Sequence, residues 1–85
     1  MSKRYQEPIE LKLSGNRKPE AFVWRGRNYK IKDVIRHWTV NGDWWQKESR
    51  RLHAIVTAKR WSEYGQYEIV YEAKRRQWYL YRVYD

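Results

Sequence analysis

Apolar and polar residues alternate with a period of two along most of this chain, and this pattern restricts it to extended strands. Ile9, Leu11 and Leu13 alternate with Glu10 and Lys12, which places the apolar side chains on one face of a strand. The segments with the same character are 21–25, 29–40, 52–58, 66–73 and 77–84. Five or six antiparallel strands at this spacing predict an all-β fold, either a single small antiparallel sheet or a partly open barrel.

The phase of the alternation slips within the segment 29–40. Tyr29 and Ile31 carry odd numbers, whereas the apolar residues Val34 and Trp38 carry even ones. A β-bulge would re-aim the strand at this point, and one short helical turn near residues 32–38 is the alternative. We favour the strand with a bulge.

Turn-forming residues separate the expected strands. They predict a loop at 14–19, a tight hairpin turn at 25–28, where Gly26 and Asn28 tolerate positive φ, a turn at 41–43 before Trp44 and Trp45, and a loop at 60–66. The last hairpin differs, because its tip carries three adjacent cations, Lys74, Arg75 and Arg76.

The chain is rich in aromatic residues, with six Trp, eight Tyr and one Phe. Those with the phase of the buried face are expected in the core: Trp24, Trp38, Tyr67, Tyr71 and Trp78. Tyr79 and Tyr81 alternate with Trp78 and Leu80, so they lie on an open sheet surface if one face is solvated. If both faces are covered, by residues 44–45 or by a second subunit, these two tyrosines are buried instead.

Length and composition narrow the class of protein. The 85 residues suffice for one small domain, 1–85, with a thin core. The chain has no cysteine, which excludes disulfides and thiolate metal sites. It also has no run of about 18 apolar residues and no signal-like N-terminus. We therefore expect a soluble cytoplasmic protein without a membrane partner.

No pattern for catalysis is present. The four glycines are isolated turn residues and form no phosphate-binding loop. His37 and His53 lack the clustered ligands or the local nucleophile that a metal site or a covalent mechanism needs. We expect a non-enzymatic protein with no cofactor and no metal.

Basic residues exceed acidic ones by 19 to 10, a net charge of +9. Such a charge attracts polyanions, so the sequence favours a nucleic-acid partner over two alternatives, an acidic protein partner and charge that serves solubility alone. The candidate nucleic-acid-binding residues are Arg25, Arg27, Lys30, Lys32, Arg50, Arg51, Lys59, Arg60, Lys74, Arg75, Arg76, Tyr79 and Tyr81. In this interpretation the cations contact phosphates and the two tyrosines stack on bases.

Three segments support a resemblance to a known family: NGDWW at 41–45, YEIVY at 67–71 and QWYLYRVYD at 77–85. Their order resembles the C-terminal tail region of bacterial ImuB-type proteins, which are polymerase-Y-like accessory factors of damage-induced mutagenesis. Residues 7–13 and 22–31 look like the front portion of small stand-alone bacterial proteins of unknown function that share this tail.

The resemblance implies a module that acts in DNA repair or translesion synthesis, with contacts to a polymerase partner, and it transfers no catalytic residue. The basic tip at 74–76 departs from the acidic or glycine-bearing turns of that pattern. The leading alternative to nucleic-acid binding is therefore a protein-interaction module that docks a repair polymerase complex through an edge strand and an aromatic patch. Self-association through the same patch is a third possibility, and the sequence leaves the oligomeric state open.

Overall fold

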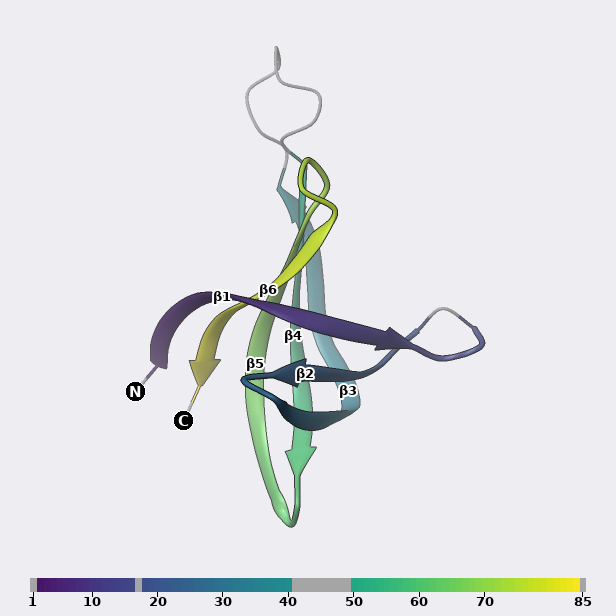
Figure 1. Ribbon diagram of the computed structural model, residues 1–85, viewed down its shortest axis with the longest axis vertical. Coiled ribbons are helices and arrows are strands. Elements are labelled where there is room, and N and C mark those ends of the chain that lie inside the picture. The colour runs from purple at the N-terminus through teal and green to yellow at the C-terminus, as the bar shows by residue number, and fades with distance from the viewer. Residues whose placement is uncertain (1, 17, 41–49, 85) are drawn as a thin grey trace.

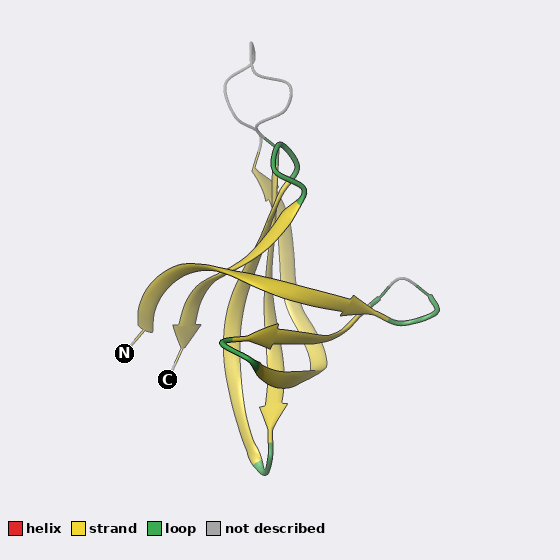
Figure 2. Ribbon diagram, viewed as in Figure 1, coloured by secondary structure: helices red, strands yellow, loops and turns green. Residues whose placement is uncertain are grey.

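A computed structural model describes residues 2–16, 18–40 and 50–84, which form strands joined by turns (Figures 1 and 2). The strands are β1 (Ser2–Leu13), β2 (Pro19–Trp24), β3 (Arg27–Val40), β4 (Arg51–Arg60), β5 (Glu63–Glu72) and β6 (Gln77–Tyr84). The described residues include no helix long and apolar enough to cross a membrane. The predicted all-β class is confirmed.

The six strands form a closed antiparallel barrel in sequence order. β1 closes it by pairing with two neighbours: Ile9 lies opposite Trp78 of β6, and the next residue, Glu10, lies opposite Val23 of β2. Both termini consequently lie at the same side of the molecule (Figure 1). The strand count was predictable from the alternation, whereas closure depends on this change of partner within β1.

The inner face of the barrel holds a small aliphatic and aromatic core. Its largest fully buried side chains are Phe22, Val56, Ile69 and Leu80, each of which contributes about 1.5–3 kcal/mol by leaving water. The ring of Tyr29 stacks on Phe22 with centroids 5.0 Å apart. Of the predicted core aromatics, Trp24 is buried, Tyr67 and Trp78 pack against the core, and half-buried Tyr71 contacts Trp78 at 5.2 Å.

β3 runs as a bulged strand through the segment whose phase slips. Its register against β4 shifts between Ile31 and Asp33 and again between Val34 and Arg36. The bulge was predicted correctly, and the helical turn near residues 32–38 is wrong. The shifts also place Trp38 opposite His53, on the outer face, so its predicted core position is wrong.

Two turns are tighter than the sequence indicated. Arg25 and Gly26 form the β2–β3 turn with φ of 53° and 73°, as a two-residue hairpin with positive φ at both positions requires. Asn28 lies in β3 opposite Val23, so the turn ends before it. The loop predicted at 60–66 is also wrong, because β5 begins at Glu63. The turn signal at 41–43 and residues 44–45 lie outside the described residues.

Candidate nucleic-acid interface

The end of the barrel at the β4–β5 turn presents two exposed aromatic rings. Trp61 is 81% exposed and Tyr64 is 56% exposed, unusual values for large rings in a domain with so small a core. Three cations of β3 and β4 lie over these rings, and a fourth, Lys30, is paired with one of them, Lys59. We call this set the hairpin patch: Lys30, Lys32, Lys59, Arg60, Trp61 and Tyr64.

Strand register explains how the patch is assembled. Lys59 lies opposite both Lys30 of β3 and Tyr64 of β5, so these three side chains share the outer face. The Nζ atoms of Lys32 and Lys59 lie 5.1 and 5.4 Å from the centre of the Tyr64 ring. Like charges directly opposite each other destabilise a sheet because they repel. Lys30 and Lys59 form such a pair, so a bound anion would reduce their repulsion.

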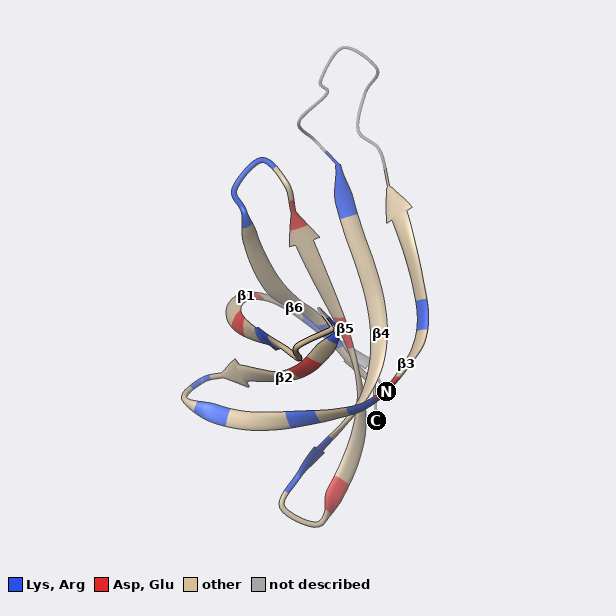
Figure 3. Ribbon diagram, turned by 90° about the vertical axis from the view of Figure 1, so that its right-hand side faces the viewer, with Lys and Arg blue, Asp and Glu red and all other residues tan. Residues whose placement is uncertain are grey.

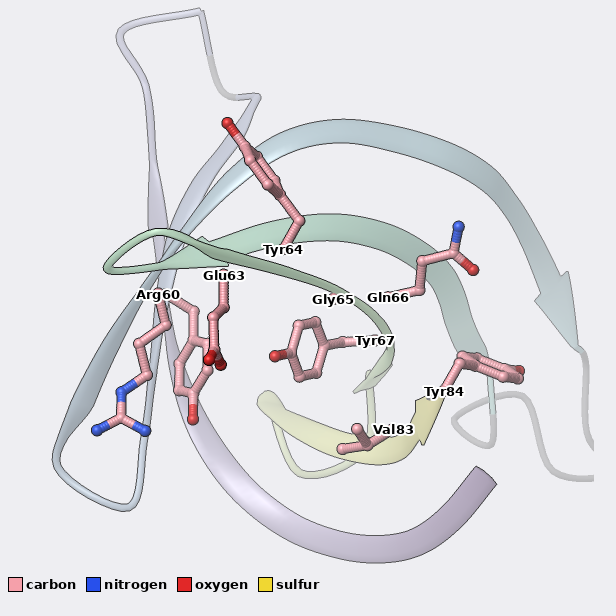
Figure 4. Close-up of a pocket in the computed structure, with 9 residues that line it drawn as sticks. Arg60, Glu63, Tyr64, Gly65, Gln66, Tyr67, Val83 and Tyr84 are labelled. Atoms are coloured by element: carbon pink, nitrogen blue, oxygen red, sulfur yellow. The ribbon is translucent and has the colours of Figure 1, made fainter. Parts of the chain in front are cut away.

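Beside the patch, the barrel mouth contains a cavity of about 560 Å³. It is lined by Tyr29, Arg60, Glu63, Tyr64, Gly65, Gln66, Tyr67, Val83 and Tyr84 (Figure 4). Glu63, Tyr67 and Val83 project toward the space that the ribbon encloses, whereas Tyr64, Gln66 and Tyr84 point away from it. Arg60 lies on the same face of β4 as the buried residues Ala58 and Val56. Because it is the last residue of β4 and lines the cavity, it lies at the rim between cavity and patch.

Gly65 shapes this cavity. A Cβ atom at residue 65 would lie 2.8 Å from the hydroxyl oxygen of Tyr67, so the absence of a side chain allows that ring to lie back along β5. The Tyr67 ring then meets Phe22 and Tyr29 edge-on, with centroids 5.6 and 5.4 Å apart.

A second concave site of about 250 Å³ lies at the opposite end of the barrel, near the β5–β6 turn. It is lined by Gln6, Arg51, His53, Val70, Glu72, Arg75, Tyr79 and Tyr81. Three of its groups already have partners: Nε of Arg75 lies 3.6 Å from Glu72, and a hydrogen bond with the Tyr79 side chain raises the pKa of Arg75. Tyr79 and Tyr81 are half-buried, so they do not lie on an open sheet surface.

The candidate residues therefore fall into separate groups (Figure 3). Lys30, Lys32, Lys59 and Arg60 belong to the hairpin patch, and Arg51, Arg75, Tyr79 and Tyr81 line the second site. The exposed side chains of Arg50, Lys74 and Arg76 lie near that second site, where the Ala73 amide donates to the Arg50 carbonyl at 3.1 Å. Arg27 is exposed beside the β2–β3 turn.

Arg25 has a structural partner. Its guanidinium donates to both carboxylate oxygens of Glu7, at 2.8 and 2.6 Å, and lies over the rings of Tyr5 and Trp24 at 5.2 and 4.8 Å. These contacts connect β1 to the β2–β3 turn, so the Arg25 guanidinium already has partners within the protein.

Sequence reasoning missed the two exposed rings of the candidate interface. Trp61 and Tyr64 were placed in a loop from 60 to 66, whereas Trp61, at φ 58°, begins a two-residue turn and Tyr64 lies in β5. The available signal was the alternation of Glu63, Gly65 and Tyr67, which continues the inward phase of Ile69. The described residues contain no cluster of three His, Asp or Glu that could hold a metal ion.

Together, the fold and this end of the molecule define a small closed antiparallel barrel with an aromatic and basic mouth. The chain belongs to the family described as Domain of unknown function (DUF6504), whose model matches residues 1–85. No curated protein and no solved structure matches the chain. The resemblance to ImuB-type tails therefore stays a prediction.

Proposed function

We propose that this barrel binds single-stranded nucleic acid on the hairpin patch. The observation that carries the proposal is the exposure of Trp61 and Tyr64 within a group of four cations. Aromatic rings that stack on bases, combined with cations that track the phosphates, are the usual elements of single-strand binding.

The contacts within the patch favour this ligand. The Arg60 guanidinium lies 4.2 Å from the centre of the Trp61 ring, so the indole is held beside a charge that a phosphate can approach. A phosphate between Lys30 and Lys59 would relieve the repulsion of two like charges at paired positions. Phosphate binding would thus stabilise the pairing of β3 with β4 at Lys30 and Lys59, where two positive charges face each other.

The second concave site is the weaker candidate. Glu72 and the Tyr79 hydroxyl already engage Arg75 there, and Tyr81 meets the His53 ring edge-on with centroids 6.0 Å apart. A ligand would have to displace these contacts, whereas the rings of the hairpin patch face solvent.

Alanine substitutions of the two rings test the proposal. We expect Trp61→Ala and Tyr64→Ala each to weaken binding of a single-stranded oligonucleotide by about 5- to 150-fold, because each base stack contributes about 1–3 kcal/mol. Leu13→Ala is the matched control, because Leu13 is an exposed apolar residue, at 52%, outside the patch. Fluorescence anisotropy of a labelled oligonucleotide measures the affinity. Unchanged affinity in both aromatic variants would remove the patch from the function.

A second candidate function rests on the free edge of β3. Among the described residues, β3 pairs with β4 alone from Asp33 to Val40, and Val34 and Ile35 are 41% and 53% exposed. Such an edge can accept an extended segment of a partner, and the ImuB-type resemblance suggests a repair polymerase. This candidate predicts binding to a purified translesion polymerase that survives salt above about 300 mM and is lost in Ile35→Lys.

A further inference from the structure

The cavity at the barrel mouth adjoins the surface on which the patch would hold a strand. We propose that it accepts one unpaired base of that strand, with guanine preferred. The inference rests on the proposed function, and it names the part of the bound strand that enters the cavity.

The position of the cavity supports base insertion. Tyr64 and Arg60 belong to both the patch and the cavity lining, so a strand stacked on Trp61 lies at the cavity rim. The rings of Tyr29 and Tyr67 form aromatic walls, as expected for a pocket that holds a planar base. The volume, about 560 Å³, lies within the range of small-ligand sites in barrel mouths.

The polar groups of the cavity complement guanine. Arg60 and Glu63 occupy paired positions across the β4–β5 turn, and both carry the inward phase of their strands. Neither forms an ion pair with a described residue. The Arg60 guanidinium lies over the Trp61 ring, a contact that uses its face and leaves its N–H donors for a ligand, and the Glu63 carboxylate supplies an acceptor. Guanidinium groups donate to guanine O6 and N7, and a carboxylate accepts from the ring N1–H and the 2-amino group.

Adenine and cytosine fit this pair less well. Adenine presents an amino donor where guanine presents O6, and it has no 2-amino group for Glu63. Cytosine can donate its amino group to a carboxylate, but it lacks the two adjacent guanine donors. Because a base within a duplex cannot reach the cavity without being extruded, the ligand is a single strand or an unpaired position.

The test uses a thymidine oligomer of about twelve nucleotides with one central position changed to guanine, adenine, cytosine or an abasic site. We expect the guanine oligomer to bind about 5- to 150-fold more tightly than the abasic one. Glu63→Gln should reduce this preference, because it removes the carboxylate acceptor while Arg60 and the aromatic walls remain. Glu20→Gln is the matched control, because it changes the net charge equally at an exposed site in β2, outside the cavity, and should retain the preference.

The outcomes separate this inference from the proposed function. Equal affinity for the guanine and abasic oligomers, with binding still lost in Trp61→Ala, would overturn base insertion and leave the patch function intact. A preference for guanine that is undiminished in Glu63→Gln would also overturn the assignment. A third outcome is that no oligomer binds, but free guanosine quenches the tryptophan fluorescence of the wild type and not that of Glu63→Gln. In that case the strand-binding function fails and the cavity remains a guanine site.

Discussion

At the scale of single residues, two carboxylates organise the barrel. Glu7 accepts hydrogen bonds from Arg25 and from the Trp24 indole, the latter at 3.1 Å. Glu68 is 5% exposed on the outer face, where its two oxygens meet Nδ1 of His53 at 3.0 Å and the Tyr84 hydroxyl at 2.9 Å. Sequence alone could not assign these pairs, because the register between neighbouring strands decides which side chains meet.

The Glu7 carboxylate makes the folding stability of the barrel depend on pH. Hydrogen bonds from Arg25 lower the pKa of Glu7 below its ordinary value of 4.5, so the folded state favours the carboxylate. This contribution is complete above pH 4.5 and is lost as the pH falls through the lowered pKa of Glu7. We expect Glu7→Gln to be less stable than wild type at neutral pH, with a difference that closes in acid.

Urea unfolding at a series of pH values measures this difference. Glu10→Gln is the control, because Glu10 is exposed on the same strand and forms no ion pair with a described residue. A difference between wild type and Glu7→Gln that stays constant down to strongly acidic pH would contradict the assignment.

The Glu68 network predicts the cost of a single hydroxyl. Burial raises the pKa of Tyr84, and the hydrogen bond to Glu68 raises it further. Tyr84→Phe removes the hydroxyl group that donates to one carboxylate oxygen of Glu68. Loss of this hydrogen bond to a buried carboxylate lowers the free energy of unfolding by about 1–3 kcal/mol. Tyr64→Phe, which changes an exposed hydroxyl, should leave the unfolding free energy unchanged in the same denaturation assay. Equal stability of the two variants would show that the Tyr84 hydroxyl contributes nothing.

At the scale of elements, β5 determines the shape of the candidate site. Its first residues carry Glu63 and Tyr67 inward and Tyr64 outward, with Gly65 leaving space between them. The alternation predicted the body of this strand but not its first three residues, because the glycine was interpreted as part of a loop. In β3 the slip of phase predicted a bulge correctly, while the resulting face of Trp38 depended on two register shifts against β4.

The role of Gly65 can be tested by adding one methyl group. Gly65→Ala would bring a Cβ atom within 2.8 Å of the Tyr67 hydroxyl, and we expect a loss of about 1–3 kcal/mol in unfolding free energy from overpacking. At Gly15 no atom lies within 4 Å of the added Cβ, so Gly15→Ala should have no comparable effect. Thermal unfolding of both variants checks this prediction, and a Gly65→Ala protein as stable as Gly15→Ala would refute it.

At the scale of the whole molecule, the chain carries a net charge of +9. The described Lys and Arg residues are spread over the closed barrel, with one group near the β4–β5 turn and another near the β5–β6 turn (Figure 3). The sequence predicted an all-β molecule, its strand segments and most of the cations that reach the two concave sites. It could not predict that Arg25 pairs with Glu7, that Tyr79 and Tyr81 are half-buried, or that Trp61 and Tyr64 are exposed. Those outcomes depend on barrel closure and on contacts between distant strands.

The most direct test of the account is the salt dependence of single-strand binding, measured with wild type and a Lys30→Gln, Lys59→Gln double variant. If the four patch cations each release a counterion, the slope of log K against log salt is about −3, and affinity falls about 50-fold between about 50 and 200 mM salt. The double variant should show about half that slope, and an Arg75→Gln, Arg76→Gln variant should keep the full slope. An undiminished slope in the first variant, or a halved slope in the second, would contradict the hairpin patch as the site of binding.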